Sequence, residues 1–165
     1  MWRAGESERV QKLLRAQLMI PYAIGGPDPK TGEWIVRGKP LPAELEPKEF
    51  DCSGLSRWTL AQGQKTDGGI VLVPHGTKDQ IKFCRPLGAE PLKLFDLGFA
   101  DLQGRDGAPY HVVIRAGKNS AGQDIVIEAR GKQGDKYGYV IEKLASVWEV
   151  QKGFLGWWRA PGIHD

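Results

Sequence analysis

The sequence predicts one α+β domain over residues 1–165, with helices in its first half and an antiparallel sheet in its second. Apolar residues recur at helical spacing in the first half, whereas after residue 110 they form short runs separated by Gly-rich turns. A block of helices followed by a block of strands is typical of the α+β class. A length of 165 residues, with 41% hydrophobic and 26% charged residues, suits a single domain with its own core.

The first helix is predicted over Ser7–Met19. Val10 and Leu14 are four residues apart and therefore lie on one face of this helix. Ser7 is the expected N-cap, because its hydroxyl can accept a hydrogen bond from a free backbone N–H group. Pro21 prevents the helix from continuing, since proline lacks the N–H group that the next turn needs.

Two further helices and one long connection complete the first half. A helix is predicted over Asp51–Gly63, with Asp51 as its N-cap and Trp58 on its buried side. Thr77–Gln80 has the pattern of a capping box and predicts a third, short helix. Residues 25–50 show no clear periodicity and are interpreted as a long connection, a kind of segment that often serves binding.

The second half of the chain changes from helical to strand-like patterning. Short runs rich in β-branched and aromatic residues alternate with turn residues, as in an antiparallel sheet. The predicted strands are Tyr110–Ile114, Ile125–Glu128, Tyr139–Ile141 and Phe154–Trp158.

Composition and charge argue against several classes of protein. No stretch approaches the roughly 20 consecutive apolar residues that a membrane-spanning helix needs. The net charge of +3 is too small to indicate a nucleic-acid-binding protein. Glu6 and Glu8 interrupt the region where the apolar core of a signal peptide would begin. Two cysteines make no disulfide framework, and no Cys/His spacing resembles a zinc site.

Cys52 is the first candidate for a catalytic residue. It follows the predicted N-cap Asp51 and so lies in the first turn of a helix, where free N–H groups and the helix dipole favour an anion. The thiolate is the nucleophilic form of cysteine, and Gly54 leaves room for a substrate backbone to approach. The alternative is that Cys52 is a small buried hydrophobic residue, as most free cysteines are.

His111 and Glu128 are the second candidate, as a pair across a hairpin. Symmetry about the polar turn at residues 117–122 predicts three opposed pairs: Ala116 with Gln123, Ile114 with Ile125, and His111 with Glu128. A carboxylate beside an imidazole fixes its tautomer and stabilises the imidazolium, which is the third-residue role in Cys–His catalysis. A one-residue slip would put the two side chains on opposite faces. The alternative interpretation is a His–Glu pair on the surface.

Four motifs together resemble those of the NlpC-type cell-wall cysteine peptidases, over a stretch from about Leu13 to Arg159. In chain order they are Pro21–Gly26, Phe50–Leu55, Thr77–Gln80 and His111–Ile114. The Asp-Cys-Ser-Gly string that follows a Tyr-x-x-Gly-Gly string is the most specific part, and the downstream strand that begins with histidine strengthens it.

This resemblance implies a papain-like fold, in which N-terminal helices pack on a central antiparallel sheet that supplies the histidine. It implies that Cys52 is the nucleophile, His111 the general base and Glu128 the third residue of a triad. It also implies that the protein is a thiol protease, which hydrolyses an amide bond in peptidoglycan stem peptides, and it implies no metal and no other cofactor. In this family the bond typically joins D-γ-glutamate to a diamino acid.

The resemblance also implies a binding site and a place of action. Tyr22 matches a tyrosine that helps hold the oxyanion or the substrate, and Asp51 and Ser53 match positions that help recognise the stem peptide. The expected protein is a monomer that acts on the bacterial cell wall, as an extracellular, periplasmic or phage-delivered enzyme such as an endolysin. Three alternatives stay open: an N-acetylmuramoyl-L-alanine amidase, an acyl or peptide transferase, and a non-catalytic cell-wall-binding domain.

The sequence departs from the family pattern at three places. Glu128 stands where the family more often has His, Asn or Gln, and its negative charge is expected to raise the pKa of His111. Residues 27–50 replace a connection that is usually short. Leu94–Leu97 stands where the family has Pro-Gly-Asp-Leu, so we expect a turn of different construction before the histidine strand.

Overall fold

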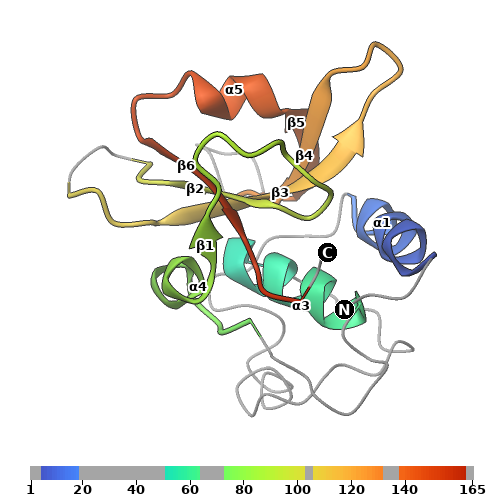
Figure 1. Cartoon of the computed structure of the whole chain (residues 1–165), viewed down its shortest axis with the longest axis horizontal. Helices are drawn as coiled ribbons and strands as arrows, with labels where there is room; N and C mark the ends of the chain where they lie inside the picture. The colour runs from blue at the N-terminus through green and yellow to red at the C-terminus, as the bar shows by residue number, and fades with distance from the viewer. Residues whose placement is uncertain (1–4, 19–50, 64–72, 103–105, 132–137, 163–165) are drawn as a thin grey trace.

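The central feature of the protein is a six-stranded antiparallel sheet with helices on both faces (Figure 1). This computed structural model describes residues 5–18, 51–63, 73–102, 106–131 and 138–162. The helices are α1 (Glu6–Ala16), α3 (Cys52–Gly63), α4 (Thr77–Phe83) and α5 (Ala145–Glu149). The strands are β1 (Arg85–Pro86), β2 (Leu97–Ala100), β3 (His111–Lys118), β4 (Asp124–Ala129), β5 (Val140–Leu144) and β6 (Phe154–Arg159), in the spatial order β1-β6-β2-β3-β4-β5.

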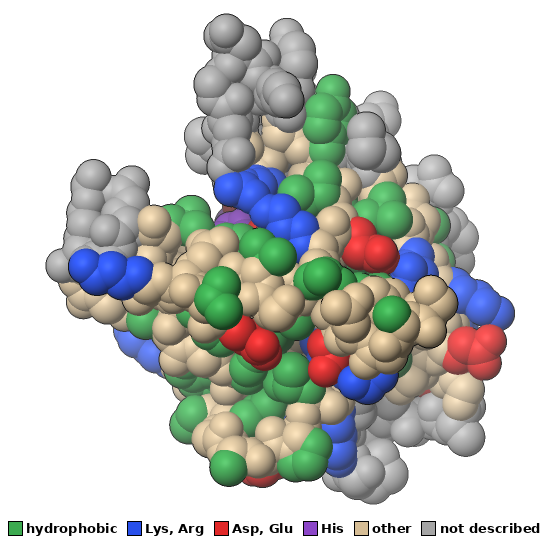
Figure 2. Space-filling view, turned by 90° about the horizontal axis from the view of Figure 1, so that it is seen from above, with side chains coloured by type: hydrophobic (Ala, Val, Ile, Leu, Met, Phe, Trp, Pro, Cys, Tyr) green, Lys and Arg blue, Asp and Glu red, His purple; other side chains and the backbone are tan. Residues whose placement is uncertain are grey.

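The prediction of helices combined with an antiparallel sheet is confirmed. Two expectations, the inserted loop at 27–50 and the position of Tyr22, lie outside the described residues. None of the described helices is both long and apolar enough to cross a membrane. Seen from the side of α5, acidic and basic side chains are interspersed over the surface, in keeping with the small net charge (Figure 2).

Alternation along the strands divides the core into two layers. Val112 and Ile114 of β3 belong to the larger apolar cluster, which also contains Leu55 and Trp58 of α3. Val113, between them, belongs to a smaller cluster on the other face, beneath α5. Because β3 is buried on both faces, its first six residues are all buried, the polar His111 and Arg115 included, and the apolar residues Val112–Ile114 follow one another without alternation.

The helix that carries Cys52 forms as predicted, directly after Asp51 and ending at Gly63. Its residues are buried around the whole circumference, so its apolar residues do not form one clean stripe. The first helix differs from the prediction, because it ends at Ala16 and no side chain caps it. Ser7 lies inside this helix and Gly5, with a φ of 81°, takes the N-cap position, so the prediction of a Ser7 cap is wrong.

The capping box predicted at Thr77–Gln80 is also wrong, although α4 begins there. Thr77 is the first helical residue, after Gly76 at the N-cap, and its hydroxyl donates to the Pro109 carbonyl oxygen at 2.6 Å. The Gln80 amide is buried and donates to the Ser53 carbonyl oxygen at 2.8 Å, across to α3. Both polar side chains therefore make tertiary hydrogen bonds that tie α4 to its neighbours, and local capping is lost.

Three elements have no counterpart in the sequence prediction: β1, β2 and α5. Strand β2 lies between β3 and β6 and all four of its residues are buried. A run this short and buried on both faces shows no period by which it can be recognised. Gly98 is required in it, because a Cβ there would lie 2.9 Å from ring atom Cζ3 of Trp157 and 2.9 Å from Cγ2 of Val113.

The turn before β2 is built on an ion pair. The Asp96 carboxylate accepts hydrogen bonds from the Arg159 guanidinium at 2.8 and 2.7 Å, and from the backbone N–H of Lys93 at 2.6 Å. The Asp96 and Arg159 side chains are both buried, so the charge of each compensates the charge of the other. Phe95 adopts a φ of 67°, a left-handed conformation that is rare for an aromatic residue and closes this turn.

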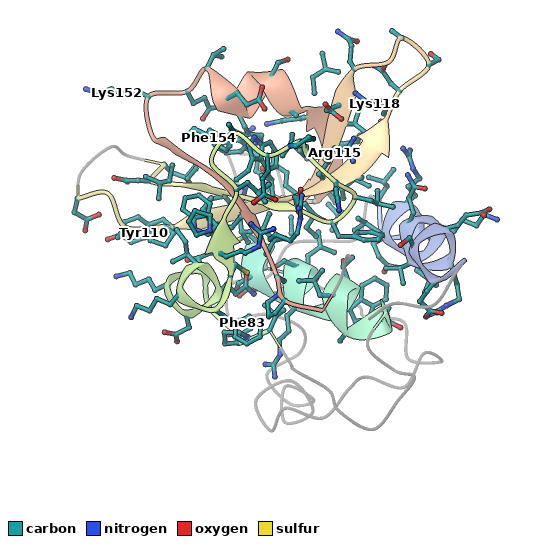
Figure 3. The ribbon with its side chains drawn as sticks, in the orientation of Figure 1. Phe83, Tyr110, Arg115, Lys118, Lys152 and Phe154 are labelled. Atoms are coloured by element: carbon teal, nitrogen blue, oxygen red, sulfur yellow. The ribbon has the colours of Figure 1, made fainter. Side chains whose placement is uncertain are left out.

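The register predicted for the β3–β4 hairpin is wrong by two residues. Ile114 lies opposite Ile127 rather than Ile125, and the register shifts once more between Arg115 and Gly117. Figure 3 labels Tyr110, the residue immediately before β3, and Lys118, the last residue of β3.

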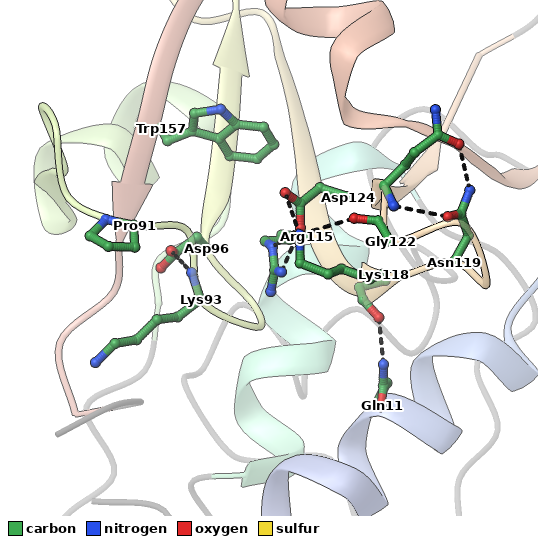
Figure 4. Close-up of polar contacts among 12 residues, drawn as sticks. Gln11, Pro91, Lys93, Asp96, Arg115, Lys118, Asn119, Gly122, Asp124 and Trp157 are labelled. Carbon is green, nitrogen blue, oxygen red and sulfur yellow. Dashed lines mark hydrogen bonds and ion pairs between the residues drawn. The ribbon is translucent and has the colours of Figure 1, made fainter.

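An irregularity at Ala116 accounts for the shift between Arg115 and Gly117. Its carbonyl oxygen accepts a hydrogen bond from the Gln11 side chain of α1 at 2.6 Å (Figure 4). Beside it, the Arg115 guanidinium bonds the Asp124 carboxylate at 2.9 and 2.5 Å. The contact from Gln11 is a tertiary one, which the sequence of the hairpin does not contain.

Candidate active site

Cys52 is the first residue of α3 and lies at the interface between this helix and the sheet. Its side chain is 9% exposed, and its sulfur lies 4.0 Å from the Tyr110 carbonyl oxygen, immediately before β3. Asp51 caps the helix: its Oδ1 accepts a hydrogen bond from the Gly54 N–H at 2.5 Å. The thiol therefore lies in the first turn of a twelve-residue helix, where the dipole stabilises negative charge.

The remaining contacts of Asp51 involve Ser53 and His75. The Ser53 hydroxyl donates to Asp51 Oδ1 at 3.3 Å, so both predicted recognition residues lie within the cap itself. Asp51 Oδ2 faces His75 Nε2 at 3.5 Å. His75 is one-third exposed and borders the start of α3, although its sequence position shows no motif that points there.

His111 and Glu128 contact each other, as predicted, but they lie in the interior and meet through a register other than the predicted one. The distance between His111 Nε2 and Glu128 Oε2 is 2.5 Å, and the two residues are 5% and 0% exposed. When the pairing of Ile114 with Ile127 is continued toward the start of β3, Glu128 lies opposite Val113 and diagonally across from His111. Long side chains can meet across such a diagonal, and an error of two residues leaves both on the same face. The alternative of a surface pair is wrong.

Two residues that the sequence analysis did not identify complete the surroundings of this pair. Trp148 of α5 stacks on the His111 imidazole, with ring centroids 5.0 Å apart and an interplanar angle of 27°. Lys143 of β5 places its Nζ 3.1 Å from Glu128 Oε1. Neither residue belongs to a recognisable motif, and α5 itself was not predicted, so no local signal could have identified them.

The electrostatics favour a charged pair. Burial alone would lower the pKa of His111, but the hydrogen bonds and negative charges of Cys52 and Glu128 outweigh it and raise this pKa to about 9. Burial would raise the pKa of Glu128, whereas the bond to His111 and the charge of Lys143 hold it below its usual value. The expectation that Glu128 raises the pKa of His111 is confirmed. At neutral pH the site holds imidazolium and carboxylate, with Nε2–H donating to Glu128.

Cys84 contrasts with Cys52. It is buried at the end of α4, and burial together with the nearby charge of Asp96 raises the pKa of its thiol to about 12. A thiol of this kind stays protonated and unreactive at neutral pH. In the described part of the chain, no group of three or more His, Cys, Asp and Glu side chains is arranged to hold a metal ion.

The arrangement has the parts that cysteine acyl transfer needs. Cys52 provides a nucleophile at a helix N-terminus, and His111 can take and return its proton. Glu128 holds the imidazole by Nε2, which leaves Nδ1 for the thiol and for a leaving group.

Comparison with known proteins identifies the fold. No protein-family model matches the sequence, and no curated protein matches it. Solved structures do match. A lipoprotein-like protein of the NLP/P60 family from Staphylococcus aureus subsp. aureus Mu50 superposes with a TM-score of 0.62 and 21% identity. That match covers 99% of this chain but 43% of the other, so the chain spans less than half the length of that protein.

Two further structures carry peptidoglycan hydrolase in their names. The NlpC/p60 domain of the peptidoglycan hydrolase SagA matches with a TM-score of 0.53 and 21% identity, over 86% of this chain and 91% of that domain. The peptidoglycan hydrolase RipB from Mycobacterium tuberculosis matches with a TM-score of 0.50 and 20% identity, over 94% of this chain and 66% of that one. The chain therefore has the NlpC/P60 fold, and the resemblance seen in its motifs is confirmed at the level of the fold.

Proposed function

We propose that this chain is a single NlpC-type catalytic domain, a cysteine endopeptidase that hydrolyses an amide bond in peptidoglycan stem peptides. One observation carries the proposal: an NlpC/P60 fold places His111 between a cysteine at a helix N-terminus and a buried carboxylate. The names of two structural neighbours, both peptidoglycan hydrolases, support the substrate class. The site of action is accordingly the bacterial cell wall.

The mechanism follows from the charges of the site. His111, held as imidazolium by Glu128, carries the proton of Cys52, and the thiolate so maintained attacks the carbonyl carbon of the scissile amide. The oxyanion that forms is stabilised by the Cys52 backbone N–H at the helix N-terminus. The imidazolium then protonates the leaving amine as the C–N bond breaks. Water, activated by neutral His111, hydrolyses the thioester and regenerates the thiol.

Three residues are proposed to bind the substrate. Tyr22 is proposed to assist the oxyanion, a role that rests on its motif. Asp51 and Ser53 are proposed to contact the stem peptide beside the nucleophile. Asp51 Oδ1 is occupied by the helix cap, so Oδ2, which faces His75, is the oxygen available to a substrate amine.

Digestion of purified cell walls of known cross-bridge chemistry, with mass spectrometry of the products, tests the proposal. A new γ-glutamyl carboxyl terminus and a freed diamino acid amine are the expected products. Release of peptide from lactyl-muramic acid would instead identify an amidase, and transfer of a peptide to an added amine would identify a transferase. Binding to walls without any release of fragments would identify a non-catalytic wall-binding domain.

Hydrolysis is expected to decline as the pH rises through about 9, because His111 loses the proton that the leaving amine needs. The decline comes at this high pH because the pKa of His111 is raised, so its imidazolium persists well above the ordinary histidine pKa of 6.5. Alkylation of Cys52 by iodoacetamide should persist above this limit, because it requires the thiolate and no proton donor. A profile of kcat/KM against pH whose alkaline limb lies near 6.5 would contradict this assignment of His111.

A further inference from the structure

The two oxygens of the Glu128 carboxylate contact two different cationic groups. Oε2 accepts from His111 Nε2 at 2.5 Å, and Oε1 lies 3.1 Å from Lys143 Nζ. Glu128 is completely buried, whereas the Lys143 side chain is 21% exposed. An interior carboxylate needs this kind of compensation, because burying an unpaired charge is strongly unfavourable.

The position of Lys143 is set by the sheet and by α5. Lys143 lies opposite Val126 on β4, and side chains alternate along a strand, so it shares a face with Glu128, two residues further along. Its ammonium also lies over the Trp148 ring, 5.7 Å from the ring centroid. The same indole stacks on His111. Lys143 and His111 are thus linked through Glu128 and through Trp148.

We propose that Lys143 is a positioning residue of the active site, which acts through Glu128. Its ammonium lies beside Oε1 of the carboxylate and compensates part of the negative charge there. Glu128 therefore orients His111 without placing a full, uncompensated negative charge beside the imidazole. The catalytic consequence rests on the proposed function, whereas the effect of Lys143 on the proton of His111 does not.

Several elements of the fold contribute groups around His111 and Glu128. Helix α3 contributes Cys52, β4 contributes Glu128 and β5 contributes Lys143, and all three influence the protonation of His111 or Glu128. Helix α5 contributes the uncharged Trp148, and β2 contributes Ala100 opposite His111. Among these groups, Lys143 is the cation that limits how strongly Glu128 holds the imidazolium proton.

NMR titration of the His111 imidazole, at constant ionic strength and without substrate, tests the proposal in the complete chain. The variant Lys143→Met should raise the pKa of His111 by on the order of one pH unit, because the uncompensated carboxylate holds the proton more tightly. Lys143→Arg keeps the charge and should restore the wild-type titration. Lys118→Met is the matched control: Lys118 pairs with Asp124 at the far end of β3 (Figure 3), so its removal should leave His111 unchanged.

Hydrolysis gives the second measurement. In Lys143→Met the alkaline limb should move upward together with the pKa of His111, and kcat near pH 7 should fall roughly tenfold, because a more tightly held proton is donated less readily. Should Lys143→Met fail to fold, Lys143→Gln keeps a hydrogen-bond donor without the charge and takes its place.

An unchanged His111 titration in the folded variant, or an equal shift in Lys143→Arg, would overturn the proposal. Because the NMR measurement uses no cell wall, it separates the two hypotheses. A shifted titration without release of wall fragments contradicts the proposed function and supports the role of Lys143.

Discussion

Replacing Cys52 by alanine is expected to abolish the release of stem-peptide fragments from purified cell walls, a loss of about 10⁴-fold or more. The thiolate forms the covalent intermediate, and alanine has no nucleophilic atom with which to replace it. The fold should survive, because Cys52 lies at the start of α3 and the cap that Asp51 makes to Gly54 does not involve the sulfur. Mass spectrometry of the soluble products, with circular dichroism of the variant, measures both effects.

Cys84 supplies the matched control. It is the second of the two cysteines, is buried, and has a thiol whose pKa is raised to about 12. Replacing Cys84 by alanine should therefore leave hydrolysis near the wild-type rate, apart from any loss of folded protein. Fragment release by the Cys52→Ala variant at the wild-type rate would sink the assignment of the nucleophile.

Replacing Glu128 by glutamine should lower kcat/KM by roughly 10²-fold and move the alkaline limb below pH 9. A neutral amide no longer stabilises the imidazolium. It also cannot suit both neighbours, because an amide oxygen turned toward His111 directs its NH₂ group at the Lys143 ammonium. The opposite orientation gives His111 a donor where the imidazolium needs an acceptor.

The double variant Glu128→Gln, Lys143→Met separates the loss of the carboxylate charge from the unfavourable contact between the amide and Lys143. Without the ammonium, the amide can turn its oxygen toward His111, so the double variant should hydrolyse walls faster than Glu128→Gln alone. The effects of the two substitutions would then be non-additive, as expected for residues that share one network. Strict additivity would show that Lys143 and Glu128 act independently.

Helix α3, which carries Cys52, shows what short-range sequence signals can predict. Asp51, Cys52 and Gly54 are close neighbours in sequence, and a cap depends only on such neighbours. The position of Cys52 at a helix N-terminus could therefore be predicted from the sequence. Cues of the same kind failed at Ser7 and Thr77, where the predicted caps do not form and Thr77 bonds Pro109 instead.

The contact between His111 and Glu128 could be predicted even though the predicted strand register was wrong. Side chains on strands repeat every two residues, so a register wrong by two still puts both residues on one face. The irregularity at Ala116, where Gln11 of α1 bonds the carbonyl oxygen, lies beyond what the hairpin sequence contains. Nearer the turn Gly117 faces Ile125, a register that would place Glu128 opposite Ile114, on the other face from His111. The irregularity shifts the register by one residue and so returns the two side chains to one face.

By itself, the sequence determined the class of fold and the helix that presents Cys52, because periodicity and capping are local properties. Only the tertiary structure decided which groups complete the site. Lys143 and Trp148 come from β5 and α5, and they reach Glu128 and His111 through strand order and helix packing. Burial then sets the protonation of the pair, since a charge in the interior depends on every charge around it.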